Sequence, residues 1–131
     1  PNPSDAARDI MGALQAGAPL ERVTLSSDSN GSLPQWNDKN EMIGIVAASM
    51  TSLLNVLREL VQAEKMEMSE ALRLATTNVS QALELHESRG KLAQGFAADI
   101  LLFDSNFNLD TVIARGKVLM QGGELQVQDT Y

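Results

Sequence analysis

The sequence predicts an α/β fold, and three stretches carry that prediction. Residues 6–16 place apolar side chains on one face of a helix and are followed by Gly17, a residue typical of helix ends. Residues 22–27 form a short β-branched run typical of a buried strand, and residues 28–34 after it are turn formers. From Ala98 onward, helical spacing gives way to short strands separated by turns. In parallel α/β folds, a polar loop at the carboxyl end of a strand is where functional residues concentrate.

The middle of the chain is predicted to be helical. Residues 35–44 are polar and irregular, and Trp36 among them lies either in the core or in a pocket wall beside the preceding polar loop. A long helix is predicted over residues 45–64, because apolar side chains recur there every three or four positions. Two shorter helices follow over residues 69–75 and 78–85, each beginning at a residue that caps helix N-termini.

The last third of the chain is predicted to be a small antiparallel β unit. Its first strand is a continuous apolar run suited to burial on both faces, and glycines mark the turns between the later strands. The predicted strands are Ile100–Phe103, Thr111–Ala114, Lys117–Met120 and Glu124–Val127. We therefore divide the chain into residues 1–88 and residues 89–131.

Composition and charge exclude several classes of function. The chain has 131 residues, enough for one domain, and no apolar run reaches the roughly 18 residues of a membrane span. A net charge of −7 repels phosphate backbones and anionic lipid, so neither nucleic acid nor a membrane is an expected partner. The absence of cysteine excludes disulfides and thiolate ligands and fits a cytoplasmic protein. The single histidine, His86, is too few for a zinc site of the usual kind.

Four stretches of the sequence resemble the amidohydrolase superfamily. Ser26–Ser32 is similar to the end of the last barrel strand, where an Asp closes a metal site, and Ala71–Val79 resembles the helix before the C-terminal segment. Gly90–Ile100 resembles the superfamily signature G-x-[IL]-x-x-G-x-x-A-D-[IL]. Leu109–Lys117 and the extended form of the Ser26–Ser32 motif are most similar to isoaspartyl dipeptidases, also called β-aspartyl peptidases.

This resemblance implies a fold and a place for the chain within it. Members of the family have a (β/α)8 metal-dependent hydrolase barrel followed by a composite β-sandwich. Residues 1–88 correspond to the last αβ units of the barrel with the following helices, and residues 89–131 to the antiparallel β unit within the sandwich. Because the sequence starts at Pro1 within an α/β pattern, we expect it to be the C-terminal portion of such an enzyme.

The resemblance also implies a cofactor, a substrate and an assembly. Family enzymes hold two zinc ions with an H-x-H pair, a carbamylated Lys, two further His and one Asp. This chain supplies the Asp alone, as Asp28, so we expect it to be inactive in isolation and not to retain the zinc. The implied substrate of the intact enzyme is a β-aspartyl dipeptide, and the enzyme is expected to be a homo-oligomer.

By the same resemblance, Asp28 is both a metal ligand and the catalytic group. A carboxylate beside a metal-activated hydroxide accepts its proton and passes it to the leaving amine. Ser32 corresponds to a hydroxyl that binds the carboxylate of the substrate. Gly31 permits close approach of the backbone, and Asn30 tolerates left-handed conformations. Ser29 stands where the family usually has glycine, so a positive φ at Ser29 would strain the loop.

Simpler interpretations and other functions stand beside these assignments. Judged only from its place after a strand, Asp28 is an ordinary turn residue. Asp99 is expected to bond to nearby backbone, and His86 to be a surface residue that interacts favourably with a helix dipole. One alternative function is another amidohydrolase activity of the dihydroorotase, hydantoinase or amino-sugar deacetylase kind. The other is a non-catalytic module that binds a partner through exposed apolar faces.

Overall fold

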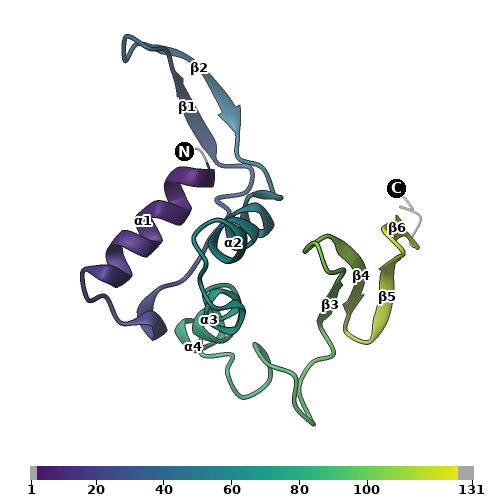
Figure 1. Ribbon diagram of the computed structural model, residues 1–131. Helices are drawn as coiled ribbons and strands as arrows, with labels where there is room; N and C mark the ends of the chain where they lie inside the picture. Colours follow the sequence, from purple (N-terminus) through teal and green to yellow (C-terminus); the bar gives the residue numbers. More distant parts are fainter. Residues whose placement is uncertain (1–2, 127–131) are drawn as a thin grey trace. The chain divides into compact units, whose positions relative to one another are not determined.

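The computed structural model describes residues 3–126, and the chain divides into two compact units, Pro1–Val79 and Ser80–Tyr131. Helices and one β-hairpin lie in the first unit, and a four-stranded sheet lies in the second (Figure 1). The predicted α/β class with a small antiparallel β unit is therefore confirmed. None of the helices within residues 3–126 combines the length and the hydropathy that a membrane crossing requires.

Helices α1, α2 and α3 build the core of the first unit. Helix α1 (Pro3–Gln15) contacts α2 (Ser52–Gln62), which in turn contacts α3 (Met68–Arg73). Helix α4 (Thr77–Ala82) follows and spans the boundary between the units. The buried apolar side chains of these helices, with the C-cap of α3 included, are Ala7, Val56, Leu57, Leu60, Ala71 and Leu74. The helix predicted over residues 6–16 is confirmed, and Gly17 follows it with a φ of 96°.

The long helix predicted over residues 45–64 is wrong in its first part. Strand β2 (Met42–Ala47) takes those residues and pairs antiparallel with β1 (Ser32–Trp36), so residues 32–36 and 42–47 form a hairpin. Helix α2 begins only at Ser52, whose hydroxyl donates a hydrogen bond to the Ser49 carbonyl at 2.9 Å. The β-branched residues of β2 favour a strand, and their cross-strand pairing with β1 outweighs the helical spacing.

The Asn37 side chain organises the turn of this hairpin, in a stretch predicted to be irregular. Asn37 Oδ1 accepts hydrogen bonds from the amides of Lys39, at 2.9 Å, and Glu41, at 3.0 Å. The Asn37 amide donates to the Glu41 carbonyl at 3.0 Å, and Asn40 has a φ of 58°. Asparagine favours such turns because its side chain bonds the backbone a few residues on. The polar stretch is therefore a defined hairpin turn.

The strand predicted over residues 22–27 does not form. A 3-10 helix, η1 (Leu20–Arg22), takes its first residue, and Val23 has extended backbone angles but belongs to no sheet. The Leu25 amide donates instead to the carbonyl of Leu74 at 2.9 Å. A strand needs a neighbouring strand for its ladder of hydrogen bonds. Within residues 3–126, one antiparallel sheet consists of β1 and β2, and the other of the four strands near the C-terminus. Neither sheet includes this segment, so it has no neighbouring strand there.

The second unit contains the predicted antiparallel sheet. Strands β3 (Ile100–Phe103), β4 (Leu109–Ala114), β5 (Lys117–Gln121) and β6 (Glu124–Leu125) pair in sequence order. The predicted strand over residues 124–127 is shorter in the structure, and Val127 lies outside the described residues. The rings of Phe103 and Phe107 stack with their centroids 4.9 Å apart beside β3. This sheet thus contains the four predicted strands, and β4 begins at Leu109 rather than at the predicted Thr111.

Helices α3 and α4 begin at residues other than the predicted caps. Glu67 caps α3, and its carboxylate accepts hydrogen bonds from the Ser69 amide, at 2.7 Å, and from the Ser69 hydroxyl. Ser69, predicted as the cap, therefore lies inside the helix. Helix α4 begins at Thr77 and is shorter than the helix predicted over residues 78–85. Glu84, with a φ of 57°, is incompatible with continuing α4 to Leu85.

Candidate functional site

Asp28 lies in a tight turn directly before the β1–β2 hairpin. The Gly31 amide donates a hydrogen bond to the Asp28 carbonyl at 2.8 Å and closes a β-turn. Asn30, the third residue of this turn, has a φ of 62°, a conformation that asparagine tolerates better than most residues. Ser29 stays outside the left-handed region, so the strain considered for it does not arise. That conformation falls on Asp28, whose φ is 47°.

Serine hydroxyls hold the backbone on the N-terminal side of the turn. Ser26 Oγ accepts a hydrogen bond from the Asp28 amide at 3.4 Å, and Ser27 Oγ accepts one from the Ser29 amide at 3.2 Å. Each hydroxyl bonds to the amide two residues further along, a local pattern that serine favours in loops. The chain therefore passes from the extended segment into the turn with both of these amides paired.

The residue after β2 fixes the other side of the turn. The Asn30 amide donates to the Ala48 carbonyl at 3.2 Å, and the Ala48 amide donates to the Gly31 carbonyl at 2.9 Å. Ser32 then begins β1 and pairs with Ala47. The register of the hairpin therefore continues into the turn. The four predicted site residues share one hydrogen-bonded frame, in which both Asp28 and Ser32 are exposed to solvent.

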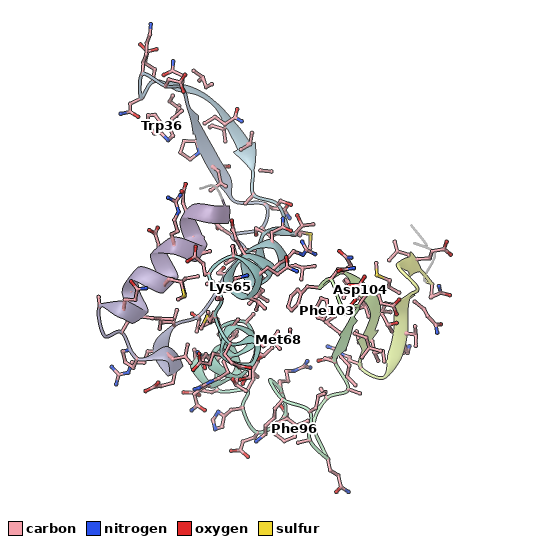
Figure 2. The ribbon with its side chains drawn as sticks, in the orientation of Figure 1. Trp36, Lys65, Met68, Phe96, Phe103 and Asp104 are labelled. Carbon is pink, nitrogen blue, oxygen red and sulfur yellow. The ribbon has the colours of Figure 1, made fainter. Side chains whose placement is uncertain are left out.

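Trp36 does not belong to this frame. It lies at the end of β1 that is remote from the turn, and its side chain is 58% exposed (Figure 2). The prediction that Trp36 packs in the core is therefore wrong. A strand rises about 3.3 Å per residue, so the length of β1 separates Trp36 from Ser32 by roughly 13 Å. This separation also argues against Trp36 as a pocket wall at the Asp28 turn.

Asn78 anchors the segment before the turn, a role that differs from the predicted one. Asn78 was predicted to cap a helix, but it lies within α4 and is only 4% exposed. Its Nδ2 donates to the carbonyl oxygens of Leu20, at 2.7 Å, and Val23, at 2.8 Å. The amide of Leu25 donates to the Leu74 carbonyl in the same region. Asn78 in α4 and the C-cap of α3, rather than a sheet, therefore hold the chain that leads to the turn.

The family of this chain follows from a comparison with known families. The model of the amidohydrolase family matches residues 3–119. The chain belongs to the amidohydrolase family. The superfamily resemblance drawn from the four sequence stretches is thereby confirmed.

Solved structures similar to this amidohydrolase chain include β-aspartyl dipeptidase from Fervidobacterium islandicum AW-1. Its complex with a β-Asp-Leu dipeptide is 29% identical to this chain with a TM-score of 0.80, covering 96% of this chain and 33% of that one. A second structure of the dipeptidase is 25% identical with a TM-score of 0.73, covering 95% and 30% of the two chains. These likenesses agree with the motif-level resemblance to isoaspartyl dipeptidases.

Other relatives are similar over a smaller part of the chain. N-acetylglucosamine-6-phosphate deacetylase from Pasteurella multocida shares the fold, with a TM-score of 0.64 at 13% identity over 86% of this chain and 33% of that one. The 5-methylthioadenosine/S-adenosylhomocysteine deaminase of Caldicellulosiruptor saccharolyticus is 33% identical over 92 residues, which are 59% of this chain and 21% of the deaminase. The chain thus spans about a third or less of the length of these relatives.

Amidohydrolases generally bind metal ions, and Asp28 is the candidate ligand that this chain offers at the turn. Its carboxylate is exposed and provides oxygen ligands of the kind that zinc accepts. Residues 3–126 contain no group of three or more His, Cys, Asp or Glu side chains that could hold a metal ion. One carboxylate does not hold zinc by itself, so the described residues do not form a zinc site. Such a site at Asp28 requires ligands from outside them.

The signature residue Asp99 has a structural role in the second unit. Its carboxylate pairs with the Arg89 guanidinium and accepts a hydrogen bond from the Arg115 amide at 2.8 Å. The expectation that Asp99 bonds to backbone is therefore confirmed. His86 lies beyond the end of α4, with its Nε2 atom 3.4 Å from Glu87 Oε1. The predicted interaction of His86 with a helix end is wrong because α4 ends earlier than predicted.

Proposed function

We propose that this chain is the C-terminal portion of a zinc-dependent isoaspartyl dipeptidase, which hydrolyses the β-aspartyl peptide bond of dipeptides. The observation that carries the proposal is its likeness, at a TM-score of 0.80 over 96% of the chain, to a β-aspartyl dipeptidase bound to β-Asp-Leu. The turn supports it, because the exposed Asp28 and the exposed Ser32 belong to one hydrogen-bonded frame. Residues 1–88 then belong to the catalytic barrel and residues 89–131 to the composite β-sandwich.

In this proposal Asp28 is the group that carries the proton. Amide hydrolysis at neutral pH needs a strong nucleophile, and zinc ions, when bound, supply one by lowering the pKa of water to about 7. The Asp28 carboxylate accepts the proton of the attacking water and passes it to the leaving amine, so one group acts as base and then as acid. Asp28 also contributes an oxygen ligand to the metal.

Ser32, Asn30 and Gly31 bind the substrate in this proposal. The Ser32 hydroxyl donates a hydrogen bond to the carboxylate of the dipeptide, and a bond to a charged acceptor is stronger than one between neutral groups. Asn30 holds the left-handed conformation of the turn. Gly31 presents backbone without a side chain, so the substrate approaches the turn closely.

The proposal extends to the whole enzyme. The remaining metal ligands, an H-x-H pair, a carbamylated Lys and two His, come from the part of the enzyme that precedes this chain. The 131-residue chain is therefore inactive in isolation. The intact enzyme is a cytoplasmic homo-oligomer, in line with the resemblance to isoaspartyl dipeptidases and with the absence of cysteine.

The test uses the full-length enzyme, meaning the product of the complete reading frame in which this sequence lies. With zinc it should release aspartate and leucine from β-Asp-Leu. Asp28→Asn should lower kcat by about 10²–10⁴-fold, because an amide cannot carry the proton. Asp38→Asn, in the turn of the β1–β2 hairpin, is the matched control and should keep the wild-type kcat. A wild-type enzyme without this activity, a fully active Asp28→Asn variant, or hydrolysis by the 131-residue chain alone would each overturn the proposal.

A second candidate function is hydrolytic deamination of a purine such as 5-methylthioadenosine. The 33% identity to a 5-methylthioadenosine/S-adenosylhomocysteine deaminase over 92 residues favours it. The two functions differ in product, because deamination releases ammonia whereas dipeptide hydrolysis releases two amino acids. Both assays on one preparation of the full-length enzyme distinguish them. Ammonia release from 5-methylthioadenosine, without hydrolysis of β-Asp-Leu, would replace the dipeptidase proposal by this one.

A further inference from the structure

Gly31 leaves a space that the Asp28 side chain occupies. A Cβ atom built on Gly31 would lie 2.7 Å from Asp28 Cγ, 2.7 Å from Asp28 Oδ1 and 2.7 Å from the Asp28 carbonyl oxygen. Real Cβ atoms essentially never approach other heavy atoms this closely. Gly31 does not have a positive φ, so its backbone conformation is open to any residue. Glycine is therefore needed at this position for the space beside Asp28 and not for the backbone angles.

From this geometry we infer that Gly31 is a positioning residue for the Asp28 carboxyl group. The inference rests on the proposed function, since it concerns the same site and the same reaction. Because Gly31 has no side chain, the carboxyl group of Asp28, four residues before Ser32, lies close to the backbone of the turn. A methyl group at Gly31 moves that carboxyl group away from the position that the wild-type turn imposes.

The hydrogen bonds of the turn determine which group yields to such a methyl group. The Gly31 amide is bonded to the Asp28 carbonyl at 2.8 Å, and the Gly31 carbonyl accepts from the Ala48 amide at 2.9 Å. A shift of the Gly31 backbone breaks this closure of the hairpin. The Asp28 side chain is exposed and rotates at a smaller cost. Two of the three close contacts are therefore relieved by moving the carboxyl group, which is the reactive part of Asp28 in the proposed function, and the contact with the Asp28 carbonyl oxygen is relieved only by a small shift of the turn backbone.

The hairpin also contains a matched control glycine. A Cβ atom on Gly44, in β2, would meet only Gln35 Oε1, at 3.4 Å, at the end of a flexible side chain. Gly44→Ala therefore adds the same methyl group to the same hairpin without touching Asp28. A difference between the variants at Gly31 and Gly44 reports on the space beside Asp28.

The first measurement is steady-state kinetics of the full-length enzyme on β-Asp-Leu. Gly31→Ala should lower kcat by about 10²-fold, since a misplacement of about 1 Å costs that much, and should also raise KM because the methyl group hinders the close approach of the substrate to the turn. Gly44→Ala should keep the wild-type kcat. A wild-type kcat in Gly31→Ala, or a loss carried by KM alone, overturns the inference. A wild-type enzyme that does not hydrolyse β-Asp-Leu overturns the proposed function instead.

The second measurement tests the contact without relying on activity. The Tm of the full-length enzyme is compared with and without Gly31→Ala, first with Asp28 present and then in an Asp28→Gly background. We expect Gly31→Ala to lower Tm by about 2–4 °C beside Asp28 and by clearly less in the Asp28→Gly background, where two of the three close atoms are gone. Folding of Gly31→Ala only in that background supports the inference equally. Equal Tm losses in both backgrounds contradict it.

Discussion

Two stretches of this molecule carry the same sequence prediction, a buried strand, and have different structures. Residues 22–27 and Ile100–Phe103 are both short runs typical of buried strands, but only the second forms one. Strand β3 finds its partner β4 a few residues further along the chain, at Leu109–Ala114. The first stretch has no partner strand within residues 3–126. A strand-favouring sequence therefore makes a segment compatible with a strand, but the strand forms only when another strand is available to pair with it.

The two stretches also satisfy their backbone groups differently. In the second unit, strand pairs exchange hydrogen bonds along their length, and Asp99 adds a bond to the turn between β4 and β5. In the first unit, Asn78 in α4 and Leu74, the C-cap of α3, provide hydrogen-bond partners for Leu20, Val23 and Leu25. Buried backbone groups must be paired in either case. In the first unit, a few specific hydrogen bonds therefore pair the backbone of residues 20–25, whereas a ladder of hydrogen bonds between strands pairs the backbone of β3 in the second unit.

The largest expected effect comes from removing the Asn78 side chain, which tests whether specific contacts hold residues 20–25. Asn78→Ala leaves the Val23 carbonyl without the Asn78 donor and the Leu20 carbonyl with the Val23 amide alone, and we expect a loss of about 2–3 kcal/mol in the free energy of unfolding. Urea unfolding of the 131-residue chain measures it. Asn55→Ala, which removes an exposed asparagine from α2, is the control and should cost less than about 0.5 kcal/mol. A cost for Asn78→Ala no larger than that of Asn55→Ala contradicts the anchoring role.

Removing Asp99 tests the second unit and should have a smaller effect. Asp99→Ala loses the bond to the Arg115 amide and the pairing with Arg89, and we expect it to cost about 1–2 kcal/mol. The strand ladder remains and limits the damage. Arg89→Met removes only the ion pair, whose side chains are 40% and 38% exposed, and should cost less than about 1 kcal/mol. Equal losses in the two variants would mean that the bond to the turn contributes nothing.

The second unit was predictable from sequence because its determinants are local. The turn between β4 and β5 consists of Arg115 and Gly116, whose φ values are 49° and 76°, as a type I′ hairpin requires. The β1–β2 hairpin was missed for the opposite reason. Met42–Ala47 is a nearly continuous apolar run, and periodicity alone does not tell a strand of that kind from a helix. Its pairing with β1 decided the outcome.

The sequence predicted that the candidate residues lie in one turn, but not the geometry of that turn. The motif suggested Asp28 and Ser32 as site residues, and the residue type of Asn30 already favoured its left-handed conformation. The contact between Asp28 and Gly31 depends on how the turn closes against Ala48, which no local pattern specifies. The Asn78 anchor joins residues 58 and 55 positions apart in the sequence. Contacts of that range depend on the packed helices and leave no periodic signal.

The smallest expected effect concerns Glu67, the N-cap of α3, the helix whose C-cap Leu74 receives the Leu25 amide. Hydrogen bonds from the hydroxyl and the amide of Ser69 lower the pKa of Glu67 from its ordinary value of 4.5. Near that value the folded state binds fewer protons than the unfolded state. The contribution of Glu67 to stability is therefore fully present above pH 4.5 and is lost as the pH falls through the lowered pKa.

Thermal unfolding between pH 7 and pH 3 measures this contribution as the difference in Tm between the wild type and Glu67→Gln. Because a glutamine does not titrate, we expect the difference to be largest above pH 4.5 and to shrink below it. Ser69→Ala removes the hydroxyl donor and keeps the amide, so part of the pH dependence should remain. A Tm difference that does not vary with pH would show that the cap acts through its shape and not through its charge.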